Sequence, residues 1–321
     1  MVICSVLYEK AMCETLMNMH PYVHMHIVYN DSSFITENIF TNNLFEIYLK
    51  QKSANSNKRV FVFNTPDYSN IGNHLIACAQ KKIFEEYFPN YELIEIDNID
   101  NFYYKSFFMH LVKDDDVIVI NGGGKVGNLW KETHFDEILF VLEHYKNNKV
   151  LVMPQSVYFS NDSAGAEYKK RFISALKRDR VLLFARENIS YSRLLDLDLS
   201  RDIVKEIPDL ALFNKQFANK QGHSRKVGFF IREDIKSNLS IGRINKIEKK
   251  VQASGYEVFH SSMLYDSGVF QWNRDCVISQ KREELLGYDL IVTDQLHCMI
   301  ECILLQIPCI AFDTKINDIN Y

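Results

Sequence analysis

Three polar side chains that could act on an anionic ligand, Asp294, Gln295 and His297, follow directly after a short apolar run near the end of the 321-residue chain. Apolar residues then recur with helical spacing from Leu296 to Ile307, which places the polar residues in the first turn of a predicted helix. That turn carries unpaired backbone amides and the positive end of the helix dipole. The pattern predicts an anion-binding site. The alternative is a helix cap at Asp294 and a solvent-facing His297.

A second candidate site is the glycine-rich stretch IVINGGGKVGNLW, which ends at Trp130 and reads as a strand, a loop and the start of a helix. Gly122, Gly124 and Gly127 match the pattern GxGxxG. The match is a weak dinucleotide signature, because this is not the first βα turn and the next predicted strand ends in Pro154 without an acidic residue. Glycines let backbone amides approach a phosphate or carboxylate, so the stretch predicts an anion site. A tight turn is the alternative.

The elements that must position these residues alternate between strand and helix. Strands are predicted at 60–63, 91–96, 117–121, 150–153, 181–185, 203–207, 227–231, 256–260, 290–292 and 309–312. Helices are predicted at 73–88, 130–145, 164–177, 189–195, 242–253, 280–287 and 296–307. Repeated βα units predict an α/β protein with parallel, doubly wound sheets. The polar stretch 214–226 divides the chain into an extension at 1–57, a domain at 58–215 and a domain at 225–321, with a closing helix expected beyond Tyr321.

Polar residues also follow several other predicted strands, and the carboxyl ends of parallel strands are where α/β proteins bind ligands. Two such domains facing each other would bring both sets of strand ends to one cleft. The residues expected at this cleft, besides those named above, include Asn73, Gln155, Ser156, Arg186, Asp209 and Arg232.

Composition limits the classes of function. The net charge of −4 and the 47% hydrophobic content describe a globular protein without the basic excess of a nucleic-acid binder. The opening MVICSVLYEK lacks a charged start followed by a long apolar core, and no later window is apolar over a membrane-spanning length. This pattern predicts a cytoplasmic protein. Its seven cysteines show no CxxC spacing, so they read as reduced thiols. His24 and His26 lack a third ligand, and no metal is expected at Cys298 and Cys302 either.

Seven short motifs in this order resemble the polysaccharide pyruvyl transferase family, and together they span Val60 to Asp313: NIGNHLI, INGGGKVGNLW, MPQSVYF, FARENISY, PDLAL, TDQLHCMI and PCIAFD. The resemblance implies two Rossmann-like domains facing a cleft in a GT-B-like arrangement. It implies transfer of a pyruvyl group from phosphoenolpyruvate to two hydroxyls of a sugar, which forms a cyclic ketal without a cofactor. The acceptor would belong to an exopolysaccharide, capsule or cell-wall glycan. Arg186, Asp209 and His297 fall on functional positions.

The chemistry needs a general acid to protonate the enolpyruvyl carbon and a base for the sugar hydroxyl. His297 is the candidate acid, Asp209 the candidate base, and Arg186 would hold anionic charge. The chain departs from the family at two positions, with Asn73 where an aspartate is usual and Gln295 where an arginine is usual. The candidate donor-binding residues are Asn73, Gly123, Gly124, Asn128, Gln155, Ser156, Arg232, Asp294 and Gln295.

Two other functions fit the same residues. One is a metal-independent GT-B glycosyltransferase that uses a nucleotide sugar, and the other is a noncatalytic relative that binds a saccharide. If the acceptor is lipid-linked, the protein would work at the inner face of the membrane, through a basic surface comprising Lys169, Lys170, Arg171, Lys177, Arg178 and Arg180. An ordinary solvated face is the alternative for these residues.

Overall fold

The computed structural model describes residues 58–98, 105–130, 134–214, 224–232, 237, 239–266 and 268–314. The predicted extension 1–57 with His24 and His26, most of the polar stretch 214–226, and a closing helix beyond Tyr321 lie outside these residues.

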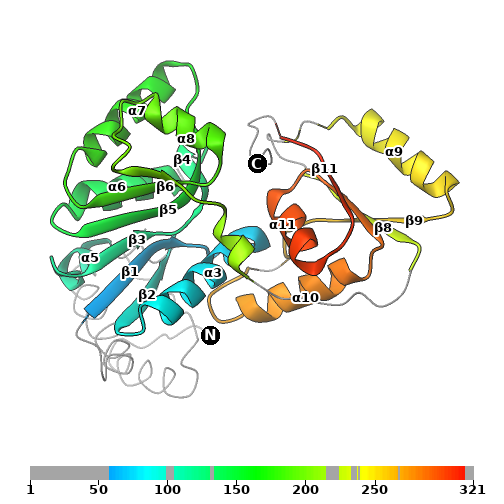
Figure 1. Ribbon diagram of the computed structural model, residues 1–321, viewed down its shortest axis with the longest axis horizontal. Coiled ribbons are helices and arrows are strands. Elements are labelled where there is room, and N and C mark those ends of the chain that lie inside the picture. The colour runs from blue at the N-terminus through cyan, green and yellow to red at the C-terminus, as the bar shows by residue number, and fades with distance from the viewer. Residues whose placement is uncertain are drawn as a thin grey trace, which may run out of the picture.

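Within the described chain, seven parallel strands form a first sheet in the order β2-β1-β3-β5-β6-β7, and β4 pairs with the later half of β5 (Figure 1). The strands are β1 (Lys58–Thr65), β2 (Tyr91–Asp97), β3 (Val117–Ile120), β4 (Gly123–Gly127), β5 (Lys149–Tyr158), β6 (Val181–Ala185) and β7 (Val204–Glu206). The connecting helices are α3 (Ile71–Tyr87), α5 (Lys105–Leu111), α6 (Asp136–His144), α7 (Ser163–Leu176) and α8 (Asn188–Leu195).

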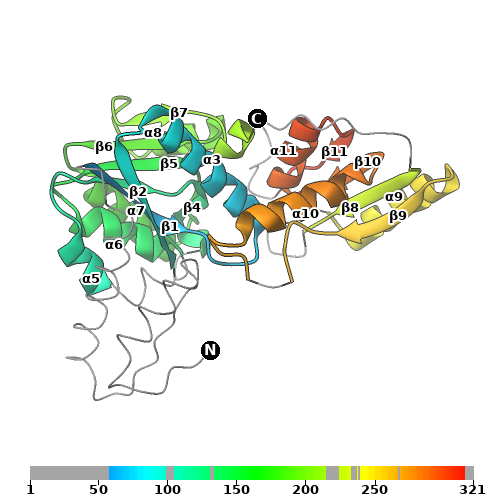
Figure 2. The same cartoon turned by 90° about the horizontal axis from the view of Figure 1, so that it is seen from below.

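Helices cover both faces of this sheet, with α6 and α3 on opposite sides (Figure 2). Strand β1 shows why. Phe61 and Phe63 point to the cluster formed with α6 and α7, while Val60 and Val62 point to the cluster formed with α3. All four side chains are buried. A strand buried on both faces is a continuous apolar run, as the sequence shows here.

The second sheet contains four described parallel strands in the order β11-β10-β8-β9. They are β8 (Lys226–Phe230), β9 (Glu257–Ser261), β10 (Leu290–Thr293) and β11 (Cys309–Ala311). Helix α9 (Ile241–Ala253) packs on one face, and α10 (Arg274–Leu286) and α11 (Leu296–Leu305) contribute to a core on the other face. Two parallel α/β sheets with helices on their faces confirm the predicted fold class.

The two sheets share one hydrophobic core. The cluster that contains α3 also contains Phe230 of β8 and Ile291 of β10. Ion pairs and hydrogen bonds reinforce the junction: Arg274 of α10 pairs with Glu95 of β2 at 2.6 Å. The backbone amide of Ile71 donates to the carbonyl of Met263 at 2.9 Å. Helix α3 therefore belongs to the packing of both halves (Figure 1).

Two predicted helices begin elsewhere in the structure, and one helix was missed. Helix α6 begins at Asp136 and not near Trp130, because the glycine-rich stretch continues as strand β4 and a short 3-10 helix, η1 (Asn128–Trp130). Helix α10 begins at Arg274, six residues before the predicted 280, since its first apolar residues, 276–278, are consecutive and give no helical period. Helix α5 was not predicted. The terminal residues of the other elements differ by a few positions from the predicted bounds.

No helix among the described residues is long and apolar enough to cross a bilayer. Two of the basic residues considered for membrane contact are engaged within the protein. Arg171 pairs with Glu143 at 2.7 Å, and Arg178 donates to the carbonyl of Leu142 at 3.3 Å. These contacts favour an ordinary solvated face for α7.

Candidate active site

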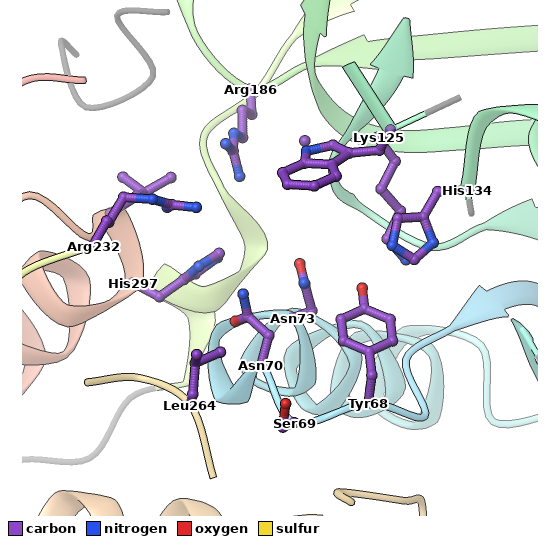
Figure 3. Close-up of a pocket in the computed structure, with 13 residues that line it drawn as sticks. Tyr68, Ser69, Asn70, Asn73, Lys125, His134, Arg186, Arg232, Leu264 and His297 are labelled. Carbon is purple, nitrogen blue, oxygen red and sulfur yellow. The ribbon is translucent and has the colours of Figure 1, made fainter. Parts of the chain in front are cut away.

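A pocket of about 290 Å³ lies between the two sheets, where the carboxyl ends of their strands meet (Figure 3). Both halves of the chain contribute to it, as the sequence predicted for a shared cleft. Among the described residues that line it, none is acidic. The lining consists of Tyr68, Ser69, Asn70, Asn73, Gly124, Lys125, Trp130, His134, Arg186, Arg232, Leu264, Leu296 and His297.

Arg186 and His297 approach each other across the pocket from different sheets, and both contact Asp209. Arg186 follows β6 and its Nη1 donates to Asp209 Oδ2 at 3.0 Å. His297 lies in the first turn of α11, with Nε2 at 3.4 Å from the same oxygen. Asp209 stands at the start of the 3-10 helix η3 (Leu210–Phe213) and accepts the backbone amide of Ala211 through Oδ1. The three residues implied by the resemblance therefore form one cluster.

Asp209 does not line the pocket. Its side chain is 1% exposed and lies behind Arg186 and His297. Burial alone would raise the pKa of this carboxyl, but His297 and then Arg186 outweigh it and lower the pKa to about 2. Both oxygens already accept contacts from protein groups. The geometry makes Asp209 a group that positions two pocket residues, and it is at odds with the expected role as a base that touches the acceptor.

Ser156 and Glu187 hold the other side of Arg186. Arg186 Nε donates to Ser156 Oγ at 2.6 Å and lies 3.3 Å from Glu187 Oε2. Glu187 also accepts the hydroxyls of Ser156 and Ser190. All four side chains are buried. Ser156 was predicted to bind the donor, but it lies behind the pocket wall and orients the guanidinium.

The acidic residue before α11 also acts behind the wall. Asp294 is fully buried and accepts the amide of Arg232 at 2.7 Å and the hydroxyl of Ser237 at 2.9 Å. Burial raises the pKa of Asp294. Gln295 does not line the pocket either, because its Oε1 accepts the amide of Met263 at 3.0 Å. The expected donor contacts of Asp294 and Gln295 are therefore replaced by contacts that fix two neighbouring loops.

The glycine-rich stretch serves backbone packing more than anion binding. A Cβ on Gly127 would lie 1.7 Å from the carbonyl oxygen of Tyr158, so only glycine lets β4 pair with β5 there. Gly124 lines the pocket, whereas Gly123 lies next to it, because a Cβ there would meet the side chains of Asn73 and Lys125. The expected loop leading into a helix is not formed.

Two more predicted donor-binding residues are committed to structural bonds. Asn128 donates to Ser160 Oγ at 2.6 Å and accepts the amide of the same residue at 2.8 Å. Gln155 donates to the carbonyl of Asn121 at 2.8 Å and accepts the amide of Lys125 at 3.2 Å. Neither residue lines the pocket. Of the predicted site residues, Asn73, Gly124, Arg186, Arg232 and His297 do.

The sequence profile of a family described as polysaccharide pyruvyl transferase matches residues 70–315, which include the pocket residues of both sheets from Asn70 to His297. The chain belongs to this family. General stress protein 30 of Bacillus subtilis is 26% identical over 259 residues, covering 80% of this chain and 75% of that protein. Pyruvyl transferase 1 of Schizosaccharomyces pombe is 23% identical over 291 residues, covering 85% of this chain and 70% of that protein.

An uncharacterized protein from Klebsiella pneumoniae has a crystal structure similar to this member of the polysaccharide pyruvyl transferase family. The TM-score is 0.57 at 19% sequence identity, and the match covers 86% of this chain and 90% of that protein. At this identity the likeness concerns the fold alone.

Several pocket residues of this pyruvyl transferase family member were not predicted as site residues: Tyr68, Ser69, Lys125, Trp130, His134, Leu264 and Leu296. A signal for some of them exists in the sequence. Tyr68 and Ser69 lie in the loop after β1, next to Asn70, and Lys125 lies within the glycine-rich stretch. Leu264 has no such signal, because it reaches the pocket through a backbone bridge between its segment and Asn70.

Proposed function

We propose that the protein transfers the pyruvyl group of phosphoenolpyruvate to two hydroxyls of one sugar in a polysaccharide precursor. The observation that carries the proposal is the convergence of Lys125, Arg186, Arg232 and His297 on one small pocket whose described lining contains no carboxylate. Phosphoenolpyruvate is a small molecule with two anionic groups. Membership of the pyruvyl transferase family supports the same reaction.

The phosphate is proposed to bind at the amino end of α11. No side-chain hydrogen bond from the N-cap residue, Gln295, caps this ten-residue helix in the described part of the chain. Its first turn reaches the pocket through Leu296 and His297, and Arg186 and Arg232 lie beside it (Figure 3). Unpaired amides, the helix dipole and guanidinium groups all favour a phosphate.

Phosphoenolpyruvate and two hydroxyls of one sugar supply all the atoms of the products. A proton adds to the methylene carbon of phosphoenolpyruvate, and one sugar hydroxyl attacks the adjacent carbon, which carries the phosphate ester. The bond from that carbon to the phosphate oxygen then breaks, and the second hydroxyl takes its place. The two hydroxyls release two protons. One replaces the proton that was added to the methylene carbon, and the other leaves with the phosphate. The products are a cyclic ketal and inorganic phosphate.

His297 is the proposed general acid. Its Nε2 lies 3.4 Å from Asp209 Oδ2, which fixes the orientation of the imidazole in the pocket wall. Arg186, held by Asp209 and Glu187, keeps a fixed guanidinium beside the same ring, where charge develops on the leaving phosphate. Asp209 is assigned a positioning role for both side chains.

The test is an assay of phosphate release from phosphoenolpyruvate with galactosides, glucosides and mannosamine derivatives as acceptors. We expect release that depends on one class of sugar and a product whose mass has grown by the pyruvyl ketal. Binding of UDP-sugars together with no binding of phosphoenolpyruvate would overturn the proposal in favour of a glycosyltransferase. Absence of binding to either donor would favour a saccharide-binding protein.

Gly72 provides a direct test of how His297 is positioned. A Cβ on Gly72 would lie 2.2 Å from His297 Nδ1, so Gly72→Ala must displace the imidazole. Because a displacement of about 1 Å in a reacting group costs roughly 100-fold in rate, we expect a fall of that order in kcat for phosphate release. Gly242→Ala is the control, since a Cβ on Gly242 meets nothing within 4 Å. Equal rates for the two variants would show that this contact does not matter.

A further inference from the structure

Lys125 is a buried cation on the pocket wall, and the charge that acts on it among the described residues, that of the buried Asp67 carboxylate, does not form an ion pair with it. Its side chain is 3% exposed, and its ammonium donates to the backbone carbonyl of Asn64 at 2.8 Å. Among the described residues, no carboxylate forms an ion pair with this ammonium. Arg186, which also lines the pocket, in contrast contacts both Asp209 and Glu187.

A buried charge is costly unless it is paired and hydrogen-bonded. An ammonium group carries three N–H donors, and the Asn64 carbonyl accepts one of them. The group lies on the pocket wall, so a ligand that enters the pocket can supply the missing acceptors. The acceptors that best offset the charge are the oxygens of an anion.

Two neutral donors flank this ammonium. The hydroxyl of Tyr68 is buried at the pocket and has no hydrogen-bond partner among the described residues, and the Tyr68 ring lies 5.8 Å from Lys125 Nζ. Asn73 reaches the same corner from the first turn of α3. A Cβ on Gly123 would lie 3.4 Å from Asn73 Oδ1 and 3.6 Å from Lys125 Cε, so both side chains border Gly123 at this corner (Figure 3).

We propose that Lys125, with the Tyr68 hydroxyl and the Asn73 amide, binds the carboxylate of the donor while its phosphate occupies the amino end of α11. This inference rests on the proposed function and adds a second anion position at the opposite corner of the same pocket (Figure 3). A carboxylate needs fewer donors than a phosphate dianion, and this corner offers one cation and two neutral donors. The arginines and the helix amino end lie on the other side.

Binding of a carboxylate here is coupled to proton uptake. Burial, against a smaller opposing effect of Asp67, lowers the pKa of Lys125 to about 8. The other titratable groups facing this corner are Tyr68, whose pKa burial raises, His74, whose pKa burial lowers to about 4, and His134. A bound carboxylate favours the charged ammonium. Near pH 8, where part of the amine is unprotonated, the protein therefore takes up protons through Lys125 as the donor binds.

The experiment is isothermal titration calorimetry at pH 8 in two buffers of different ionisation enthalpy, with phosphoenolpyruvate and with ethyl phosphate, which lacks the carboxylate. Lys125→Arg keeps a charge that does not titrate at this pH, and Lys125→Met removes the charge. Lys249→Met on exposed α9 is the matched control. We expect Lys125→Met to weaken phosphoenolpyruvate binding roughly 10- to 100-fold and to leave ethyl phosphate binding unchanged. We expect Lys125→Arg to lose this additional proton uptake.

The outcomes separate the two proposals. If the wild-type protein binds phosphoenolpyruvate but both Lys125 variants bind it with unchanged affinity and unchanged proton uptake, the carboxylate assignment is wrong and the proposed function stands. Equal weakening of ethyl phosphate and phosphoenolpyruvate in Lys125→Met would move Lys125 to the phosphate and also overturn the assignment. If the wild-type protein does not bind phosphoenolpyruvate, the proposed function itself fails. Unchanged ethyl phosphate binding in Lys125→Met shows that this variant retains its fold.

Discussion

Replacement of His297 by alanine is expected to lower kcat for phosphate release roughly 100- to 10,000-fold, the usual effect of removing a general acid. The imidazole borders the pocket and lies against Gly72 and Asp209, outside the apolar clusters, so we expect the fold to survive with a modest loss of melting temperature. Phosphoenolpyruvate should still bind, because Arg186, Arg232 and the amino end of α11 remain.

The measurements are single-turnover phosphate release, donor affinity by calorimetry and thermal unfolding. His144→Ala is the control, since His144 is an exposed histidine at the end of α6 whose ring nitrogen contacts only its own helix. A His297→Ala protein that releases phosphate at the wild-type rate would remove His297 from the chemistry. A variant that no longer folds would instead identify the ring as a structural element of the domain junction.

Asp209→Asn is expected to destabilise the protein by about 3–5 kcal/mol at neutral pH, the range observed when one partner of a buried ion pair is removed. The carboxylate is fully buried, contacts Arg186 at 3.0 Å and His297 at 3.4 Å, and is the charge that offsets both. Urea unfolding at pH 7 measures the difference. Asp179→Asn, at an exposed position after α7, is the control and should lie within about 0.5 kcal/mol of the wild type.

The pH dependence of that difference follows from the lowered pKa of Asp209. The folded-state pKa of about 2 lies below the value near 3.9 of an unfolded chain, so the unfolded protein binds more protons between these values. The stabilisation is therefore present above about pH 4 and is lost as the pH falls toward 2. The wild type and Asp209→Asn should converge in stability at low pH. A difference that stays constant from pH 7 to pH 3 would mean that the ionised carboxylate is not its source.

Short continuous apolar runs, separated by helical stretches, identified nearly every strand of both sheets. Such runs arise because these strands are buried on two faces. Helix α5 left no comparable signal, and β4 was hidden because its glycines resemble a ligand-binding loop. Strand β4 needs these glycines because Gly127 closely approaches the backbone of Tyr158. This is a tertiary contact that one sequence does not reveal. The hydrogen bond from Lys125 to the carbonyl of Asn64 and the backbone bridge between Leu264 and Asn70 also join segments that are far apart in the sequence. A single sequence does not reveal such contacts either.

The sequence located the polar residues at the strand ends but did not separate those that face the ligand from those behind them. Arg186 and Asp209 both follow strands, yet one lines the pocket and the other is covered by it. The distinction depends on side-chain direction and on partners from another sheet. Lys125 was overlooked for the same reason, because its burial follows from the pairing of β4 with β5 and not from its immediate neighbours in the chain.

The core shared by the two sheets limits how this chain can be divided. Helix α3 follows the first strand of the first sheet, but its buried face completes the packing of α10 and α11, which belong to the second. A fragment that ended at Asn214 would leave that face exposed to water, and a fragment that began at Ser224 would lack one wall of its own interior. Neither half is expected to be soluble when it is expressed alone. Two fragments produced together would have to associate through this core, and activity would return only with their reassembly.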